Sequence, residues 1–191
     1  FAAGLHQALK DDANGYVMRL AQNGQPIATL QWNWARRPSD GGQGWNPQRR
    51  MHVASVSKLI TAIAAVNLLH DKGISWDAPI GPYLPAYWNR GTNANQITFR
   101  ELLTHTSGIE VPGSATNFPT MKAEIAAGVQ NNPGSQYENT NFGLFRIIIP
   151  VINGDVNKDA LQALGNNPIF APVVDNWWDL VTVGAYQSYV N

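Results

Sequence analysis

Cysteine is the most informative absence in this sequence. None of the 191 residues is a cysteine, which excludes disulfide bonds, thiolate metal sites and a cysteine nucleophile. Because a chain without cysteine folds in either redox environment, the absence is compatible with a reducing or an oxidising compartment.

An excess of charge of either sign is missing as well. Thirteen acidic and thirteen basic residues give a formal net charge of zero, so nothing in the charge points to nucleic acid or to an anionic membrane as a partner. The longest apolar stretch is too short and too often interrupted to span a bilayer, and no basic-then-apolar leader precedes it. The chain begins at Phe1 rather than at methionine, and we expect this terminus to have been processed or trimmed.

The sequence does contain an apolar run that begins with a serine and a lysine. Leu59 to Leu69 has apolar residues at helical spacing, and His70 to Gly73 is a plausible C-terminal stop. The pattern predicts a buried helix. If this helix begins near Ser55, Lys58 lies one turn further along the same face. A hydroxyl and an amine are then held together, as an activated serine nucleophile requires.

A structural interpretation of the same two residues is available. A four-residue pattern with two fixed positions often arises by chance, and Ser55 could simply cap a helix whose Lys58 points to solvent. Two observations favour a catalytic role for Ser55 and Lys58 over this alternative. The chain has one Ser-x-x-Lys only, and the apolar helix would bury Lys58 unless a partner or a cleft accommodates it.

The rest of the chain predicts one hairpin and several helices, with no linker between domains. With 44% hydrophobic residues, the 191-residue chain suits one domain, or one compact domain plus part of a second. Extended segments on either side of Asn23-Gly24 predict a β-hairpin at about 16–34. A helical region is expected at about 55–191. Pro150 should kink or end one of its helices. The helices expected outside the Ser55 run cover 3–11, 99–104, 119–129, 139–149, 158–164 and 175–190.

Two residues four apart, Glu101 and His105, allow a second kind of site. Thr98 and Glu101 form a capping box that opens the helix at 99–104, and the segment from His105 to Gly108 ends it. The pair could bind a metal or act as a charge relay. With no third ligand candidate nearby, a single helical ion pair or hydrogen bond is the favoured interpretation.

Tyr-x-Asn triplets occur at Tyr87, Tyr137 and Tyr189, so the pattern alone has little specificity. Tyr87 lies in a proline-rich loop and Tyr189 ends a helix. Tyr137 follows Pro133-Gly134 and precedes an apolar helix, where a side chain can project into a cleft. Only Tyr137 has a setting suited to a site.

Taken in order, these motifs resemble the serine β-lactamase-like family, which includes class C β-lactamases, family VIII carboxylesterases and D-alanyl-D-alanine carboxypeptidases. Ser-x-x-Lys is the first signature of penicillin-recognising serine enzymes. Asn23-Gly24 and Leu84-Pro85 also fall in the family's order, so the resemblance covers nearly the whole chain. The matching blocks are Ala54 to Lys58, Ile97 to Ile109, Pro133-Gly134 and Tyr137 to Gly143.

The resemblance implies a fold and a set of roles. It implies an α+β fold, the α/β sandwich of the β-lactamase and penicillin-binding-protein type. The residue matching Ser55 is the acylated nucleophile, the one matching Lys58 assists its deprotonation, and the one matching Tyr137 acts as base or proton shuttle. Asn139 matches a residue that hydrogen-bonds the substrate and the lysine. The Leu-Leu-Thr-His-Thr-Ser-Gly block is expected to be structural.

One family motif is missing from this sequence. The family has a third motif, Lys-Thr-Gly or His-x-Gly, on a later strand whose backbone N–H completes the oxyanion hole. This chain has no Lys-x-Gly or His-x-Gly. We therefore expect residues 1–191 to be the N-terminal portion of a single catalytic domain, to need the C-terminal part with its sheet strands, and to be inactive alone.

The function implied is a serine hydrolase that forms an acyl-enzyme at Ser55 with an ester or an amide, including β-lactams and D-Ala peptides. It needs no metal and no cofactor, and the family resemblance suggests a periplasmic or secreted location. Substrate specificity is set by pocket loops and by the third motif. An esterase or a generic β-lactamase-like hydrolase is favoured over an efficient β-lactamase. The alternative is a non-catalytic binding or structural module that retains the fold.

Overall fold

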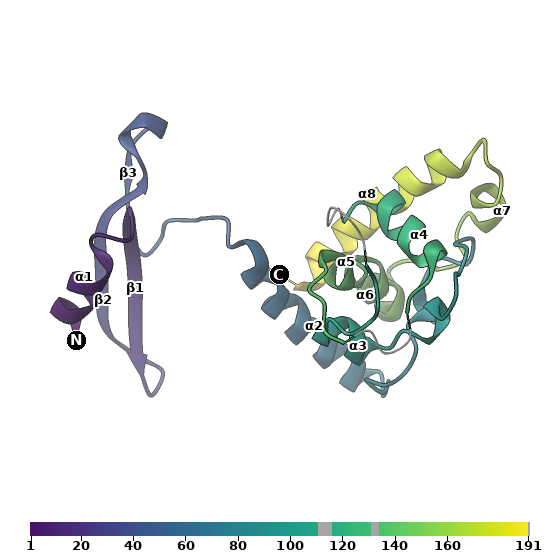
Figure 1. Ribbon diagram of the computed structural model, residues 1–191, viewed down its shortest axis with the longest axis horizontal. Coiled ribbons are helices and arrows are strands. Elements are labelled where there is room, and N and C mark those ends of the chain that lie inside the picture. The colour runs from purple at the N-terminus through teal and green to yellow at the C-terminus, as the bar shows by residue number, and fades with distance from the viewer. Residues whose placement is uncertain (111–115, 131–133, 191) are drawn as a thin grey trace. The chain divides into compact units, whose positions relative to one another are not determined.

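The computed structural model describes residues 1–110, 116–130 and 134–190. It divides into two compact units, which we call the hairpin unit (residues 1–53) and the helical unit (residues 54–191) (Figure 1). The α+β character expected from the sequence is confirmed, because a small sheet and a set of helices are both present. No helix within the described ranges combines the length and the apolar character needed to cross a membrane.

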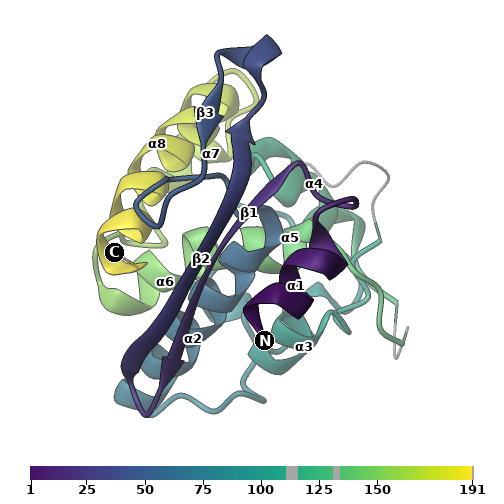
Figure 2. The same ribbon diagram turned by 90° about the vertical axis from the view of Figure 1, so that its left-hand side faces the viewer.

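The hairpin unit is built on two long antiparallel strands, β1 (Gly15–Gln22) and β2 (Gln25–Arg36), which run side by side (Figure 2). Asn23 and Gly24 connect them with φ of 50° and 76°, the left-handed conformation that a tight hairpin turn requires. The predicted hairpin is therefore confirmed. A short β3 (Gln43–Gly44) pairs with the end of β2, and α1 (Ala2–Leu9) precedes the sheet.

The hairpin unit has no core of its own. His6 of α1 contacts the sheet through a 3.0 Å hydrogen bond between its Nδ1 and the Tyr16 hydroxyl, and its ring lies edge-on to Trp32. Yet no side chain in residues 1–53 is buried. Since an isolated hairpin is marginal in water, these contacts alone are a weak basis for independent stability.

The helical unit has a continuous apolar core. Its helices are α2 (Ser57–Asp71), α3 (Phe99–Thr104), α4 (Phe118–Ala127), α5 (Asn139–Gly143), α6 (Phe145–Asn153), α7 (Gln162–Gly165) and α8 (Ala171–Val190). The central helix α6 packs against both α8 and α2, and its residues from Ile147 to Ile149 are almost fully buried. The largest fully buried side chains of the core are Trp178, Phe99, Phe118 and Phe145.

The helix predicted after Ser55 is present, and within the helical unit one of its faces is buried. It ends at Asp71, with Lys72 as its C-cap and a left-handed Gly73 after it, within the stop that the sequence indicates. Its buried residues are Thr61, Ala65, Leu68 and Leu69, which face the rest of the unit. On the opposite face Leu59, Ile60 and Ile63 are 62%, 50% and 54% exposed. Within the helical unit, therefore, one face of α2 packs against the core and the opposite face is exposed.

The capping box of α3 is confirmed in full. The Thr98 hydroxyl accepts a hydrogen bond from the Glu101 backbone N–H, and the Glu101 carboxylate accepts one from the Thr98 backbone N–H. The helix ends at His105, whose φ of 57° is left-handed. The chain therefore turns sharply immediately after α3.

The later helices differ from expectation at their ends. The apolar helix after Tyr137 is interrupted at Leu144, between α5 and α6, and it continues past Pro150 to Asn153, so Pro150 does not end it. In place of the helix predicted at 158–164, the structure has the four-residue helix α7 (Gln162–Gly165). Helix α8 begins at Ala171, four residues before the expected position 175. Pro172 lies in the first turn of α8, where proline loses no intrahelical hydrogen bond. The predicted turn residues 131–133 and most of the loop after Val111 lie outside the described residues.

Candidate active site

Ser55 lies in a 3₁₀ turn, Ala54–Val56, that leads directly into α2. Ala54 has a φ of 44°, a left-handed conformation that costs a residue with a Cβ about 1 kcal/mol. Such strain is typical of functional sites, where it presents a side chain at a fixed angle. Lys58 follows three residues later, on the first turn of α2, so the two side chains lie on the same face.

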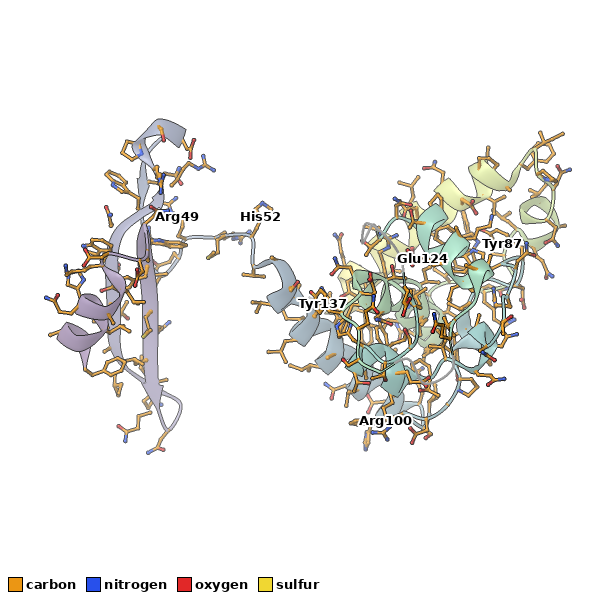
Figure 3. All side chains as sticks on the ribbon, viewed as in Figure 1. Arg49, His52, Tyr87, Arg100, Glu124 and Tyr137 are labelled. Carbon is orange, nitrogen blue, oxygen red and sulfur yellow. The ribbon has the colours of Figure 1, made fainter. Side chains whose placement is uncertain are left out.

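Tyr137 and Asn139 contact Ser55 and Lys58 from a later part of the chain. Asn139 is the first residue of α5, and Tyr137 lies in the segment just before it. Figure 3 labels Tyr137 beside the first turns of α2. The backbone N–H of Gln136 donates to the His105 carbonyl at 2.8 Å, which ties this segment to the end of α3.

The structure brings together the four site residues that the sequence singled out. Ser55 Oγ and the Tyr137 hydroxyl share a hydrogen bond of 2.6 Å. The Lys58 ammonium donates to Ser55 Oγ at 3.2 Å and to Asn139 Oδ1 at 2.7 Å. The Lys58 Nζ also lies 4.8 Å from the centre of the Tyr137 ring. The result is a hydroxyl in contact with both a potential base and a cation, which is the geometry of an activated serine.

These side chains border an open cavity of about 330 Å³, a size that suits a small organic molecule. Ser55, Lys58 and Asn139 line it, and Tyr137 lies at its edge through its contact with Ser55. The sequence analysis did not select Thr116 or Phe142, which also line the cavity. Neither residue carries a group that a motif search would mark, so only the fold shows their place.

The charges around the site favour an ionised tyrosine. The Lys58 ammonium, followed by the Ser55 hydroxyl, lowers the pKa of Tyr137 below its ordinary value. A phenolate at this position is stabilised by both neighbours. Tyr137 can therefore serve as a base at lower pH than a free tyrosine could.

His105 lies against Tyr137 rather than against Glu101. The Glu101 carboxylate accepts hydrogen bonds from the backbone N–H and the hydroxyl of Thr98, at 2.8 and 3.0 Å, so the predicted pair with His105 is wrong. The physical reason is the left-handed backbone of His105, which turns its side chain away from the helix face that the spacing assumed. Within the described residues, no group of three or more potential ligands could hold a metal ion.

The His105 ring stacks on the Tyr137 ring, with 4.6 Å between ring centres and 29° between planes. Its Nδ1 accepts a hydrogen bond from the Glu138 backbone N–H at 3.2 Å and lies 3.2 Å from Asn141 Nδ2. Burial, with the nearby Lys58 charge, lowers the pKa of His105. The sequence analysis missed this contact, because His105 and Tyr137 are far apart in the chain.

Known proteins are similar in sequence to this chain over most of its length. The chain is 28% identical over 149 residues to a putative penicillin-binding protein, PbpX, of Bacillus subtilis, covering 75% of this chain and 35% of that protein. It is 29% identical over 140 residues to the esterase/beta-lactamase LipL of Mycobacterium tuberculosis, covering 68% and 31%. The chain thus spans about a third of the length of these relatives.

Solved structures give the same result for the fold. A class C beta-lactamase from Rhodobacter sphaeroides superposes with a TM-score of 0.63 at 25% identity, over 80% of this chain and 44% of that one. A beta-lactamase/D-alanine carboxypeptidase from Yersinia pestis superposes with a TM-score of 0.60 at 21% identity, over 89% and 51%. A model of the beta-lactamase family matches residues 3–168. By sequence and by fold, this chain belongs to the beta-lactamase family.

Proposed function

We propose that the protein is a serine hydrolase that forms an acyl-enzyme at Ser55 with an ester or an amide, including β-lactams and D-Ala peptides. The observation that carries this proposal is the position of Ser55 Oγ, 2.6 Å from the Tyr137 hydroxyl and 3.2 Å from the Lys58 ammonium. The relative named as an esterase/beta-lactamase and the solved class C beta-lactamase support hydrolysis as the reaction class.

The proposed steps use only these side chains and water. Tyr137, as phenolate, takes the proton of Ser55 while Oγ attacks the carbonyl carbon of the substrate. When the tetrahedral intermediate collapses, the carbonyl C–O or C–N bond breaks and the leaving group takes the proton from Tyr137. Water then attacks the Ser55 ester, which releases the acid and restores the serine.

Lys58 and Asn139 have supporting roles in this proposal. The Lys58 ammonium favours the phenolate form of Tyr137 by lowering its pKa, and the hydrogen bonds from Lys58 to Ser55 Oγ and Asn139 Oδ1 fix the ammonium in place. Because Asn139 Oδ1 is occupied by Lys58, its amide N–H groups are the ones that can bind a substrate oxygen in the cavity.

Lys58→Met should move the acidic limb of the pH profile of kcat/KM to higher pH. The lysine lowers the pKa of Tyr137, so its removal raises that pKa and the phenolate forms only at higher pH. The measurement is kcat/KM against pH for the variant and the wild type. Lys72→Met, at the exposed far end of α2, is the matched control. An acidic limb that stays in place would contradict the role given to Lys58.

We also propose that residues 1–191 are the N-terminal portion of one catalytic domain. The exposed apolar face of α2, with Leu59, Ile60 and Ile63, supports this proposal, because no described part of the helical unit covers it. One oxyanion donor can be the Ser55 backbone N–H, and the second is assigned to the remainder of the domain.

The isolated chain should accordingly be inactive. Loss of one oxyanion donor costs on the order of 10² to 10³ in rate, and a loosely held Ser55–Tyr137 pair costs more. The test is Ser55 acylation and near-ultraviolet circular dichroism of residues 1–191, with and without the remainder of the domain. A well-ordered, fully active isolated chain would overturn this proposal.

Substrate class is tested with a panel of p-nitrophenyl esters, nitrocefin and D-Ala-D-Ala peptides, compared by kcat/KM in the complete domain. We expect turnover of at least one ester. If none of the three substrate classes is hydrolysed, and Ser55→Ala leaves the affinity for these compounds unchanged, the protein is a binding module that keeps the fold but does not catalyse hydrolysis.

A further inference from the structure

Tyr137 is held in place by few contacts for a residue at the centre of a site. Its side chain is 56% exposed, and it lies in a segment outside any helix or strand. Its hydroxyl contacts Ser55, Lys58 Nζ lies 4.8 Å from the centre of its ring, and the ring stacks on His105. An exposed side chain on such a segment samples several rotamers unless a neighbour restricts it.

We infer that His105 is a positioning residue, which holds the Tyr137 ring in the orientation that brings its hydroxyl to Ser55. This inference rests on the proposed function, in which Tyr137 is the base. His105 does not contact the reacting atoms itself, so its effect on the reaction passes through Tyr137.

The first argument is that His105 binds the chain on both sides of Tyr137. Its carbonyl accepts from the Gln136 N–H at 2.8 Å, and its Nδ1 accepts from the Glu138 N–H at 3.2 Å. The residues immediately before and after Tyr137 are therefore both attached to His105. The stacked ring, 4.6 Å away, then restricts the side chain between them.

The second argument is that the hydrogen bonds around the His105 ring fix it in one protonation state. A backbone N–H can only donate, so Nδ1 must be unprotonated to accept from Glu138. Asn141 Oδ1 accepts from the buried Ser107 hydroxyl at 2.5 Å, which leaves Asn141 Nδ2 to donate to the same ring nitrogen. His105 is thus the neutral tautomer that carries its proton on Nε2.

A neutral ring is required beside this site. The charged groups that face His105 are Lys58 and Glu138, and the Lys58 ammonium already lies 4.8 Å from the Tyr137 ring. Protonating Nδ1 would add a second cation and would break the hydrogen bond from the Glu138 N–H. The buried Ser107 and Asn141 thereby act through His105 on the orientation of Tyr137.

The test uses His105→Ala, His105→Asn and Thr104→Ala in the complete domain, with ¹³C-labelled tyrosine. Asparagine tolerates the left-handed backbone of position 105 and keeps a hydrogen-bond acceptor, so this variant should fold. Thr104 is the control, because among the described residues its hydroxyl forms hydrogen bonds with the Arg100 carbonyl and the Thr106 hydroxyl only. The ¹³Cζ chemical shift of Tyr137, followed against pH, measures the ionisation of this tyrosine directly. It can be recorded whether or not the protein is catalytically active.

In both His105 variants we expect the Tyr137 titration to move to higher pH, because a ring that is free to move spends less time beside Lys58. We expect kcat to fall on the order of 10- to 100-fold, with KM changed little, as for a misplaced catalytic group. The loss should be smaller in His105→Asn than in His105→Ala. A Tyr137 titration and a kcat like those of the wild type in His105→Ala would overturn the inference.

The two proposals fail in different ways. A wild-type protein that is not acylated at Ser55 contradicts the proposed function. In that case the Tyr137 titration still tests the inference about His105. A titration at higher pH in both His105 variants supports the positioning role, and an unchanged titration overturns it.

Discussion

Ser55→Ala should lower kcat of the complete domain on the order of 10⁶-fold, the loss seen when the nucleophile of a serine hydrolase is removed. Alanine leaves the cavity, Lys58 and Tyr137 in place but has no oxygen to form the acyl-enzyme. Because Ser55 is exposed in a 3₁₀ turn, the change should leave the folded structure intact.

The control for this prediction is Ser188→Ala. Ser188 is an exposed serine on α8, and its replacement should leave kcat unchanged. The measurement is steady-state hydrolysis of the best ester in the panel, with thermal unfolding recorded for each variant. A folded Ser55→Ala variant that keeps most of its turnover would exclude Ser55 as the nucleophile.

Tyr137→Phe should lower kcat on the order of 10²- to 10⁴-fold, the usual contribution of a general base. Phenylalanine keeps the ring that stacks on His105, so the variant removes the hydroxyl 2.6 Å from Ser55 Oγ and little else. The loss should therefore report proton transfer rather than packing.

Tyr189→Phe is the matched control, because Tyr189 belongs to another Tyr-x-Asn triplet and lies near the end of α8. It should behave as wild type in the same assay of kcat and kcat/KM. An equal loss of kcat in Tyr137→Phe and Tyr189→Phe would mean that Tyr137 has no catalytic role of its own.

Local patterns predicted the parts of the fold that depend on residues close in sequence. Asn23-Gly24 predicted the hairpin, because its two left-handed residues suit a tight turn between strands. Thr98 and Glu101 predicted the start of α3 through a capping box that needs no other part of the chain. The spacing of Ser55 and Lys58 predicted that their side chains lie together, and they are 3.2 Å apart, although Ser55 belongs to the 3₁₀ turn that precedes α2.

The features that local patterns did not predict depend on partners far away in the chain. Nothing in the run from Leu59 to Leu69 shows that only one face has neighbours within the helical unit. The stack of His105 on Tyr137 requires a left-handed residue after α3 and a segment about thirty residues further on. Neither helix periodicity nor motif spacing contains that information.

Helix ends were the least predictable feature. Proline has no N–H, and a proline inside a helix usually ends it or bends it. Pro150 is almost fully enclosed by the core, and α6 continues to Asn153 around it. Pro150 therefore does not end the helix within this core, where α6 packs against α2 and α8.

The central claim is that Ser55 is acylated, and covalent labelling tests it most directly. The complete domain is treated with a fluorophosphonate or a fluorescent penicillin, digested, and mapped by mass spectrometry. We predict a single modified peptide with the label on Ser55 and no label in the Ser55→Ala variant. A label on any other residue, or an equal label in the variant, would contradict the assignment.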